Sequence, residues 1–173
     1  MSTLLAAGGS ASASVAFKQP VTLPRVVSGA APAPPAGFAA VAPLSMVPRG
    51  LSSAPSFDGG PIVVLRAESG EISALSLHCC HKAAELSLGD IEDAAGRLSV
   101  KCPRHRKKFP GGLTFDCKTG AAWCAGEPQE GAWRNDWGSP GDVAVFETRQ
   151  DGEWLWASVR PIIERRGPAP SDD

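Results

Sequence analysis

The sequence is poor in features that mark several common protein classes. It contains no stretch approaching the ~20 consecutive apolar residues of a membrane-spanning helix, so we expect no transmembrane segment. The formal net charge of −1 gives no reason to expect nucleic-acid binding. Histidine is scarce, with three residues among 173, and tyrosine is absent. The sequence therefore predicts neither a membrane span nor a nucleic-acid partner.

Long helical patterns and internal repeats are also missing, and from residue 37 onward the pattern is that of short strands. Runs of β-branched and alternating apolar residues are separated by turns rich in glycine and proline. Asp151-Gly152 is a hairpin turn dipeptide between the last two runs. We expect an all-β fold. The predicted strands are Phe38–Ala42, Pro61–Arg66, Ile72–Leu77, Leu98–Lys101, Val143–Thr148 and Trp154–Val159.

Acidic residues are absent before Asp58. Of the first 37 residues, 23 are Ala, Ser, Gly or Pro, and only Lys18 and Arg25 are charged. This composition is typical of an organelle transit peptide, for a chloroplast or a mitochondrion, or else of a disordered tail on a cytoplasmic protein. We predict a tail over residues 1–36, a domain over residues 37–162 and a flexible C-terminal tail over residues 163–173.

Cysteine is present in an odd number, five residues, which does not resemble the dense and even framework of a small secreted disulfide protein. All three histidines lie near cysteines in the sequence. The pattern is Cys79-Cys80-His81, then 20 residues, then Cys102-Pro103-Arg104-His105. Each half places one thiol and one imidazole in a short turn between strands, so the two turns together offer two thiolates and two imidazoles to one metal centre.

Two kinds of centre use such a set. Zinc binds two Cys and two His tetrahedrally, and one type of [2Fe–2S] cluster takes two Cys on one iron and two His on the other. Zinc sites usually place Cys beside Cys and His beside His, whereas here each turn supplies one of each. This mixed pattern favours the iron–sulfur cluster, and a zinc-stabilised interaction module remains the alternative.

Further segments resemble one family. Phe38-Ala-Ala-Val-Ala-Pro-Leu is similar to the opening strand of Rieske ferredoxins, and Leu88-Gly-Asp-Ile-Glu-Asp is similar to stand-alone Rieske domain-containing proteins of animals. The turn Lys118-Thr119-Gly120 continues the match. The resemblance implies two antiparallel sheets with a small inserted cluster-binding subdomain. It also implies one cluster per chain, with Cys79 and Cys102 on the inner iron and His81 and His105 on the outer iron.

Two departures from the family pattern bear on the redox potential. Rieske proteins of cytochrome complexes carry a disulfide between the two loops, but the equivalent residues here are Ala84 and Arg104. Those proteins also have Ser and Tyr donors after the second ligand histidine, where this chain has Lys107 and Phe109. The reduced cluster therefore has fewer hydrogen-bond donors to stabilise it, and we expect a lower, ferredoxin-like reduction potential. Residues 110–114 look like a small insertion.

Neighbouring residues of the ligand types have simpler interpretations. Cys80 would break the spacing if it replaced Cys79, so we expect it not to be a ligand. His78 is predicted to point away from the site. Cys117 and Cys124 are predicted to be core thiols, which behave as small hydrophobic side chains.

Basic residues surround the second ligand turn. They are either a solvated loop or a docking surface for an acidic redox partner, which charge of this sign would attract. These residues are Lys101, Arg104, Arg106, Lys107 and Lys108.

The sequence predicts an electron carrier with no catalytic site of its own. A Rieske oxygenase needs a second, mononuclear iron held by two His and a carboxylate, and no histidine follows His105. The chain could still serve as the carrier or small subunit of a multicomponent oxygenase or reductase system.

Overall fold

The computed structural model of the chain describes residues 21–26, 31–80, 82–94, 97–104, 112–124 and 142–164. Within these ranges the chain forms strands and two short 3₁₀ turns, η1 (Leu44–Met46) and η2 (Leu86–Leu88), and no α-helix. The predicted all-β class is confirmed. The strands are β1 (Val21–Thr22), β2 (Phe38–Pro43), β3 (Gly50–Ala54), β4 (Ile62–Arg66), β5 (Ile72–Ser76), β6 (Asp90–Ala94), β7 (Arg97–Lys101), β8 (Leu113–Asp116), β9 (Ala122–Cys124), β10 (Val145–Phe146), β11 (Thr148–Asp151) and β12 (Trp154–Ser158).

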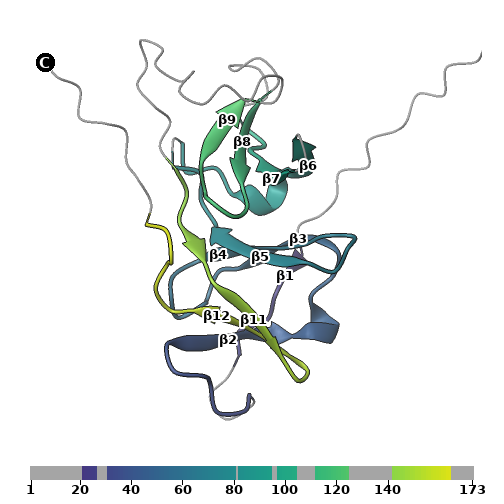
Figure 1. The fold of residues 1–173 in the computed structure, drawn as a ribbon, viewed down its shortest axis with the longest axis vertical. Coiled ribbons are helices and arrows are strands. Elements are labelled where there is room, and N and C mark those ends of the chain that lie inside the picture. The colour runs from purple at the N-terminus through teal and green to yellow at the C-terminus, as the bar shows by residue number, and fades with distance from the viewer. Residues whose placement is uncertain are drawn as a thin grey trace, which may run out of the picture.

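The strands form three sheets stacked along the long axis of the molecule (Figure 1). A central sheet has the order β1-β3-β4-β5-β10, and an outer sheet has the order β11-β12-β2. The third sheet, β6-β7-β8-β9, forms a separate lobe on the other side of the central sheet. All pairings are antiparallel except that of β1 with β3.

The central sheet is buried on both faces, which explains the continuous apolar run in β4. Successive side chains of a strand point to opposite faces. Ile62 and Val64 accordingly pack into the cluster shared with the outer sheet, whereas Val63 and Leu65 pack into the cluster shared with the lobe. A strand covered on both sides needs no polar face. The lobe is therefore anchored on the central sheet by a continuous apolar core.

The lobe is an insertion between two neighbouring strands of the central sheet. β5 leads into it, and β10, which follows it, pairs with β5 through Val145 opposite Leu75 and Phe146 opposite Ala74. The Ser76 amide donates to the Ala144 carbonyl at 2.9 Å and extends this pairing. The chain thus leaves and re-enters the central sheet at adjacent positions, which confirms the predicted inserted subdomain.

The predicted hairpins form, with one change. β4 and β5 pair antiparallel as expected. The predicted strand Val143–Thr148 is divided in two, because β10 pairs in the central sheet and β11 pairs with β12 in the outer sheet. The final hairpin turns at Gly152 and Glu153 rather than at Asp151, which still pairs with Trp154.

Both ends of the ordered core extend past the predicted boundaries. Val21 and Thr22 pair with β3, and Leu23, 3% exposed, packs in the core although it falls within the predicted tail of residues 1–36. At the other end the Val145 amide donates to the Ile163 carbonyl at 3.0 Å. Residues 21–26 and 163–164 are therefore part of the described structure.

No helix among the described residues is long and apolar enough to cross a membrane.

Candidate metal centre

The first predicted ligand turn is a tight loop that follows β5. The Cys79 amide donates to the Ala84 carbonyl at 2.8 Å, and the Ala83 amide donates back to the Cys79 carbonyl at 3.0 Å. Ala83 adopts a left-handed conformation with φ of 50°, a region in which a non-glycine residue is strained. His78 and Glu85 form a bridge below the loop. These contacts place Cys79 where the loop meets the core.

The second predicted ligand turn begins directly after β7. The Cys102 amide donates to the Leu113 carbonyl at 2.7 Å, so the residues that enter and leave this loop are held side by side. Val100 and Phe115 face each other in the β7–β8 pairing just behind it. Cys102 therefore occupies the same place in its loop that Cys79 occupies in the first: the base, next to the core.

The two thiols lie in one buried cluster. Cys79 and Cys102 are both 0% exposed and belong to the apolar core between the lobe and the central sheet, together with Leu86, Leu113 and Phe115. An isolated thiolate in such surroundings would carry a large desolvation cost. Iron or zinc, which soft thiolate ligands select, would offset this cost by coordinating both sulfurs. The buried pair thus fits the inner iron of a [2Fe–2S] cluster.

The two predicted imidazole ligands, His81 and His105, lie outside the described residues. Among the residues that are described, no group of three or more His, Cys, Asp or Glu side chains could hold a metal ion. The structure brings the two thiols into one core, and the complete four-residue ligand set stays a prediction.

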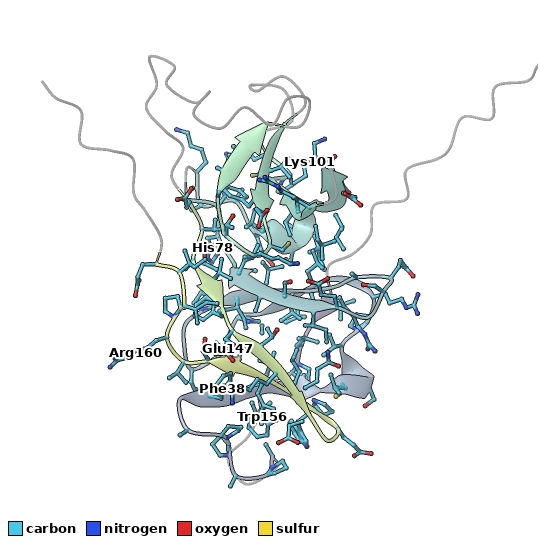
Figure 2. The ribbon with its side chains drawn as sticks, in the orientation of Figure 1. Phe38, His78, Lys101, Glu147, Trp156 and Arg160 are labelled. Carbon is cyan, nitrogen blue, oxygen red and sulfur yellow. The ribbon has the colours of Figure 1, made fainter. Side chains whose placement is uncertain are left out.

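Other thiols and imidazoles near the loops have different surroundings. His78 is exposed at the level where the lobe meets the central sheet (Figure 2), and Cys80 is half-buried. Cys117 is 2% exposed in the same core as Cys79 and Cys102. Burial raises the pKa of the Cys117 thiol to about 12, and the carboxylates of Asp116 and Glu71 add to the rise. Cys117 is therefore a neutral core thiol, whereas the side chain of Cys124 lies outside the described residues.

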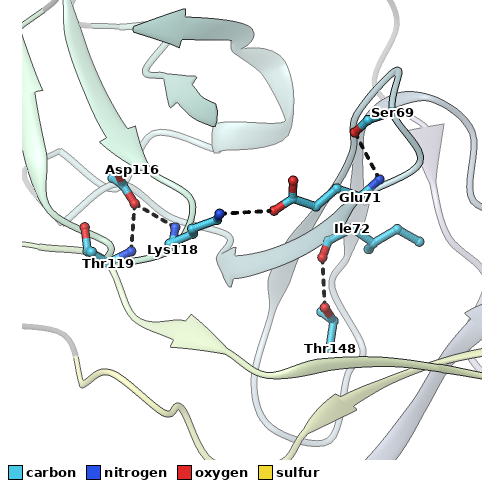
Figure 3. A network of polar contacts seen from close by, with 7 residues as sticks. All are labelled: Ser69, Glu71, Ile72, Asp116, Lys118, Thr119 and Thr148. Atoms are coloured by element: carbon cyan, nitrogen blue, oxygen red, sulfur yellow. Dashed lines mark hydrogen bonds and ion pairs between the residues drawn. The ribbon is translucent and has the colours of Figure 1, made fainter. Parts of the chain in front are cut away.

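The β8–β9 turn joins the lobe to the central sheet. Asp116 Oδ1 accepts hydrogen bonds from the amides of Lys118 and Thr119 at 2.7 and 2.8 Å (Figure 3). Lys118 Nζ lies 3.9 Å from Oε1 of Glu71, which follows the turn before β5. Sequence reasoning recognised this turn only as part of a family resemblance. The spacing of Asp116 before Lys118-Thr119-Gly120 is the signal that identifies a side-chain-capped turn.

The charged residues of the predicted docking surface divide into two groups. Arg104 is exposed, but Lys101 is only 20% exposed and pairs with Glu92, their Nζ and Oε1 atoms being 2.6 Å apart. Arg106, Lys107 and Lys108 lie outside the described residues. The charge of Lys101 is therefore compensated inside the lobe, and a docking role for these basic residues stays a prediction.

The structure describes part of the segment after the second loop. Residues 110–114 are predicted to be an insertion relative to the family; Leu113 and Thr114 of this segment belong to β8 and pair with Cys124 and Trp123 of β9. Of this segment, residues 110 and 111 lie outside the described residues.

Comparisons with known proteins agree with this arrangement. The sequence profile of the Rieske [2Fe–2S] domain matches residues 37–128. A Rieske domain-containing protein of Homo sapiens is 44% identical over 47 residues, which cover 27% of this chain and 30% of that protein. The chain thus spans less than a third of this human relative. The ferredoxin subunit of 3-phenylpropionate/cinnamic acid dioxygenase from Escherichia coli K12 is 35% identical over 82 residues, covering 47% of this chain and 67% of the subunit.

A solved structure shows the same fold. The ferredoxin of carbazole 1,9a-dioxygenase from Nocardioides aromaticivorans superposes with a TM-score of 0.52 at 22% identity, covering 71% of this chain and 98% of that chain.

Proposed function

Because this chain belongs to the Rieske [2Fe–2S] domain family, we propose that it holds one cluster through Cys79, His81, Cys102 and His105 and carries single electrons as a ferredoxin-like protein. The observation that carries the ligand assignment is the joint burial of Cys79 and Cys102, both 0% exposed in one apolar core, at the bases of two loops. By residue match to the Rieske family, the cysteines would bind the inner iron and the histidines the outer iron.

When bound, the cluster supplies reversible one-electron chemistry. The protein's part is to exclude water from the sulfur side. Leu86, Leu113 and Phe115 are each 0% exposed in the core that contains both cysteines. A dry, apolar environment disfavours the more highly charged reduced state. Together with Lys107 and Phe109 in place of hydroxyl donors, this supports a ferredoxin-like potential below zero.

The partner is proposed to be another redox protein. The Escherichia coli relative is the ferredoxin subunit of a dioxygenase, which supports a role as the carrier component of a multicomponent oxygenase or reductase system. Docking would use the exposed Arg104 with Arg106, Lys107 and Lys108 of the same loop, and not Lys101. Charge on such a surface mainly accelerates encounter, so its effect weakens with salt.

The docking proposal is tested with the double variant Arg106→Glu/Lys107→Glu. Electron transfer to an acidic partner should slow at low ionic strength and approach the wild-type rate at high ionic strength. An unchanged rate at low salt would remove the docking role while leaving the cluster assignment intact.

The cluster assignment is tested by iron and sulfide analysis with EPR of the reduced protein. The wild-type protein should contain two iron and two sulfide per chain by the definition of the cluster and give a rhombic signal. Cys79→Ser and Cys102→Ser should lose the cluster, whereas the matched variants Cys80→Ser and Cys117→Ala should keep it. A colourless protein with stoichiometric zinc would instead establish the zinc-stabilised module.

A further inference from the structure

An ion pair lies at the entrance to the second ligand loop. Lys101 Nζ is 2.6 Å from Glu92 Oε1, and the two side chains are 20% and 28% exposed. In the pairing of β6 with β7, Asp90 lies opposite Lys101 and Glu92 lies opposite Ser99. Lys101 and Glu92 are therefore diagonal neighbours on one face of the hairpin, a position from which long side chains meet.

The stem of Lys101 also packs against the exit of the same loop. A Cβ added to Gly112 would lie 2.6 Å from Cε of Lys101, so the lysine stem passes close to the backbone of Gly112. Cys102 follows Lys101 and Leu113 follows Gly112, and the Cys102 amide donates to the Leu113 carbonyl. Lys101 thus bridges both ends of the loop that carries two of the four proposed ligands.

This pair differs from the ion pair at the lobe joint. Lys118 and Glu71 are 3.9 Å apart and 77% and 48% exposed, so water and salt screen their charges. The charges of Lys101 and Glu92 are less exposed and therefore act more strongly on their surroundings. Lys101 immediately precedes Cys102, so an uncompensated charge at either position would be felt at the proposed cluster.

We propose that Lys101 and Glu92 are a charge-compensated pair whose two members shift the reduction potential of the centre at Cys102 in opposite directions, rather than part of the docking surface. This inference rests on the proposed function. Reduction adds a negative charge to the centre, which a nearby cation stabilises and a nearby anion opposes. With both residues present the two effects largely cancel.

The test measures the midpoint potential of four variants by redox titration, with the EPR signal reporting the reduced centre. Glu92→Gln removes one negative charge beside Lys101 and should raise the potential. Lys101→Met keeps most of the stem but removes the cation, and should lower it. The double variant Glu92→Gln/Lys101→Met should return towards the wild-type value, and Lys101→Arg, which keeps the charge, should stay near it.

The matched controls are Glu71→Gln and Lys118→Met, which remove the exposed pair and should move the potential much less than the Lys101 and Glu92 variants. A pair that only stabilised the lobe would lower the melting temperature in both single variants without moving the potential in opposite directions. Single variants with control-like potentials would overturn the inference. A wild-type protein that contains no iron and sulfide would instead refute the proposed function, so the two failures are distinguishable.

Discussion

Gly120 and Val143 are in direct backbone contact. The Val143 amide donates to the Gly120 carbonyl at 3.0 Å, and a Cβ on Gly120 would lie only 2.1 Å from the Val143 carbonyl oxygen. Gly120 ends the β8–β9 turn of the lobe, and Val143 leads into β10 of the central sheet. The contact therefore fixes the lobe to the sheet at the point where the chain returns from the insertion.

Gly120→Ala should destabilise the protein for two reasons. The glycine has φ of 71°, and the new methyl group would collide with backbone that cannot move as a side chain does. We expect a loss of roughly 3 kcal/mol or more in the free energy of unfolding, the sum of backbone strain and overpacking. Chemical denaturation measures it.

The control is Gly152→Ala in the β11–β12 turn, where φ is 58° and no atom lies within 4 Å of the added Cβ. That variant carries the strain without the collision and should lose only about 1 kcal/mol. Equal losses at the two positions would show that the close contact with Val143 has no energetic weight.

Cys117 should be unreactive in the folded protein. Its pKa is raised to about 12, so at pH 8 the thiol is protonated, and its 2% exposure also blocks reagents. Alkylation at pH 8 should therefore be slow in the native state and fast in denaturant, as measured by peptide mass spectrometry. Rapid native labelling would contradict the burial of this side chain.

The same shift predicts a loss of stability at alkaline pH. The unfolded thiol ionises near pH 9.0 and the folded one near 12, so above pH 9.0 the unfolded state binds fewer protons and stability falls as pH rises towards 12. Cys117→Ala should flatten this part of the stability curve. The two curves should differ in slope above pH 9.0 and run parallel below it.

The sequence predicts the parts of the structure that depend on local pattern. The β4–β5 hairpin follows from a β-branched run and the turn at Glu68–Glu71, and the inserted lobe follows from the family resemblance. The cysteine spacing places Cys79 and Cys102 in two loops. Their joint burial in one core agrees with the shared site that the spacing indicates.

The pairing of strands that are distant in the sequence cannot be predicted from local pattern. The division of Val143–Thr148 between two sheets depends on which strands lie beside each half, and both halves have the same local pattern. The strand β1 has only two residues, too few for periodicity to detect. The partner of Lys101 was missed because Lys101 was assigned by its charge alone. The β6–β7 hairpin around Gly96 would have placed Glu92 diagonally across from it.

Thr114→Val should keep or raise stability. Thr114 is 0% exposed, and its hydroxyl oxygen is buried with no hydrogen-bond partner among the residues that the structure describes, an arrangement that costs about 1–3 kcal/mol. Valine has nearly the same shape and removes the polar group. Thr148→Val is the matched control, because the Thr148 hydroxyl donates to the Ile72 carbonyl at 2.9 Å (Figure 3) and its loss should cost about 1 kcal/mol. A comparable loss at both positions would contradict the unpaired hydroxyl.

The last prediction concerns the N-terminal segment. We propose that it acts as an organelle transit peptide and is cleaved on the N-terminal side of Val21. The Leu23 amide donates to the Ser53 carbonyl at 2.8 Å, and its side chain is buried in the core. Deleting residues 1–20 should leave the melting temperature unchanged. Deleting residues 1–26 removes β1 and Leu23 and should cost at least the roughly 1.5–3 kcal/mol of one buried leucine. Leu23→Ala in the full chain separates the leucine's share from that of the strand.

After import into isolated organelles, mass spectrometry should find a mature N-terminus at or before residue 21. Cleavage near residue 36 with retained stability would show that β1 is dispensable, and absence of import would refute the transit peptide while leaving the truncation results to stand on their own.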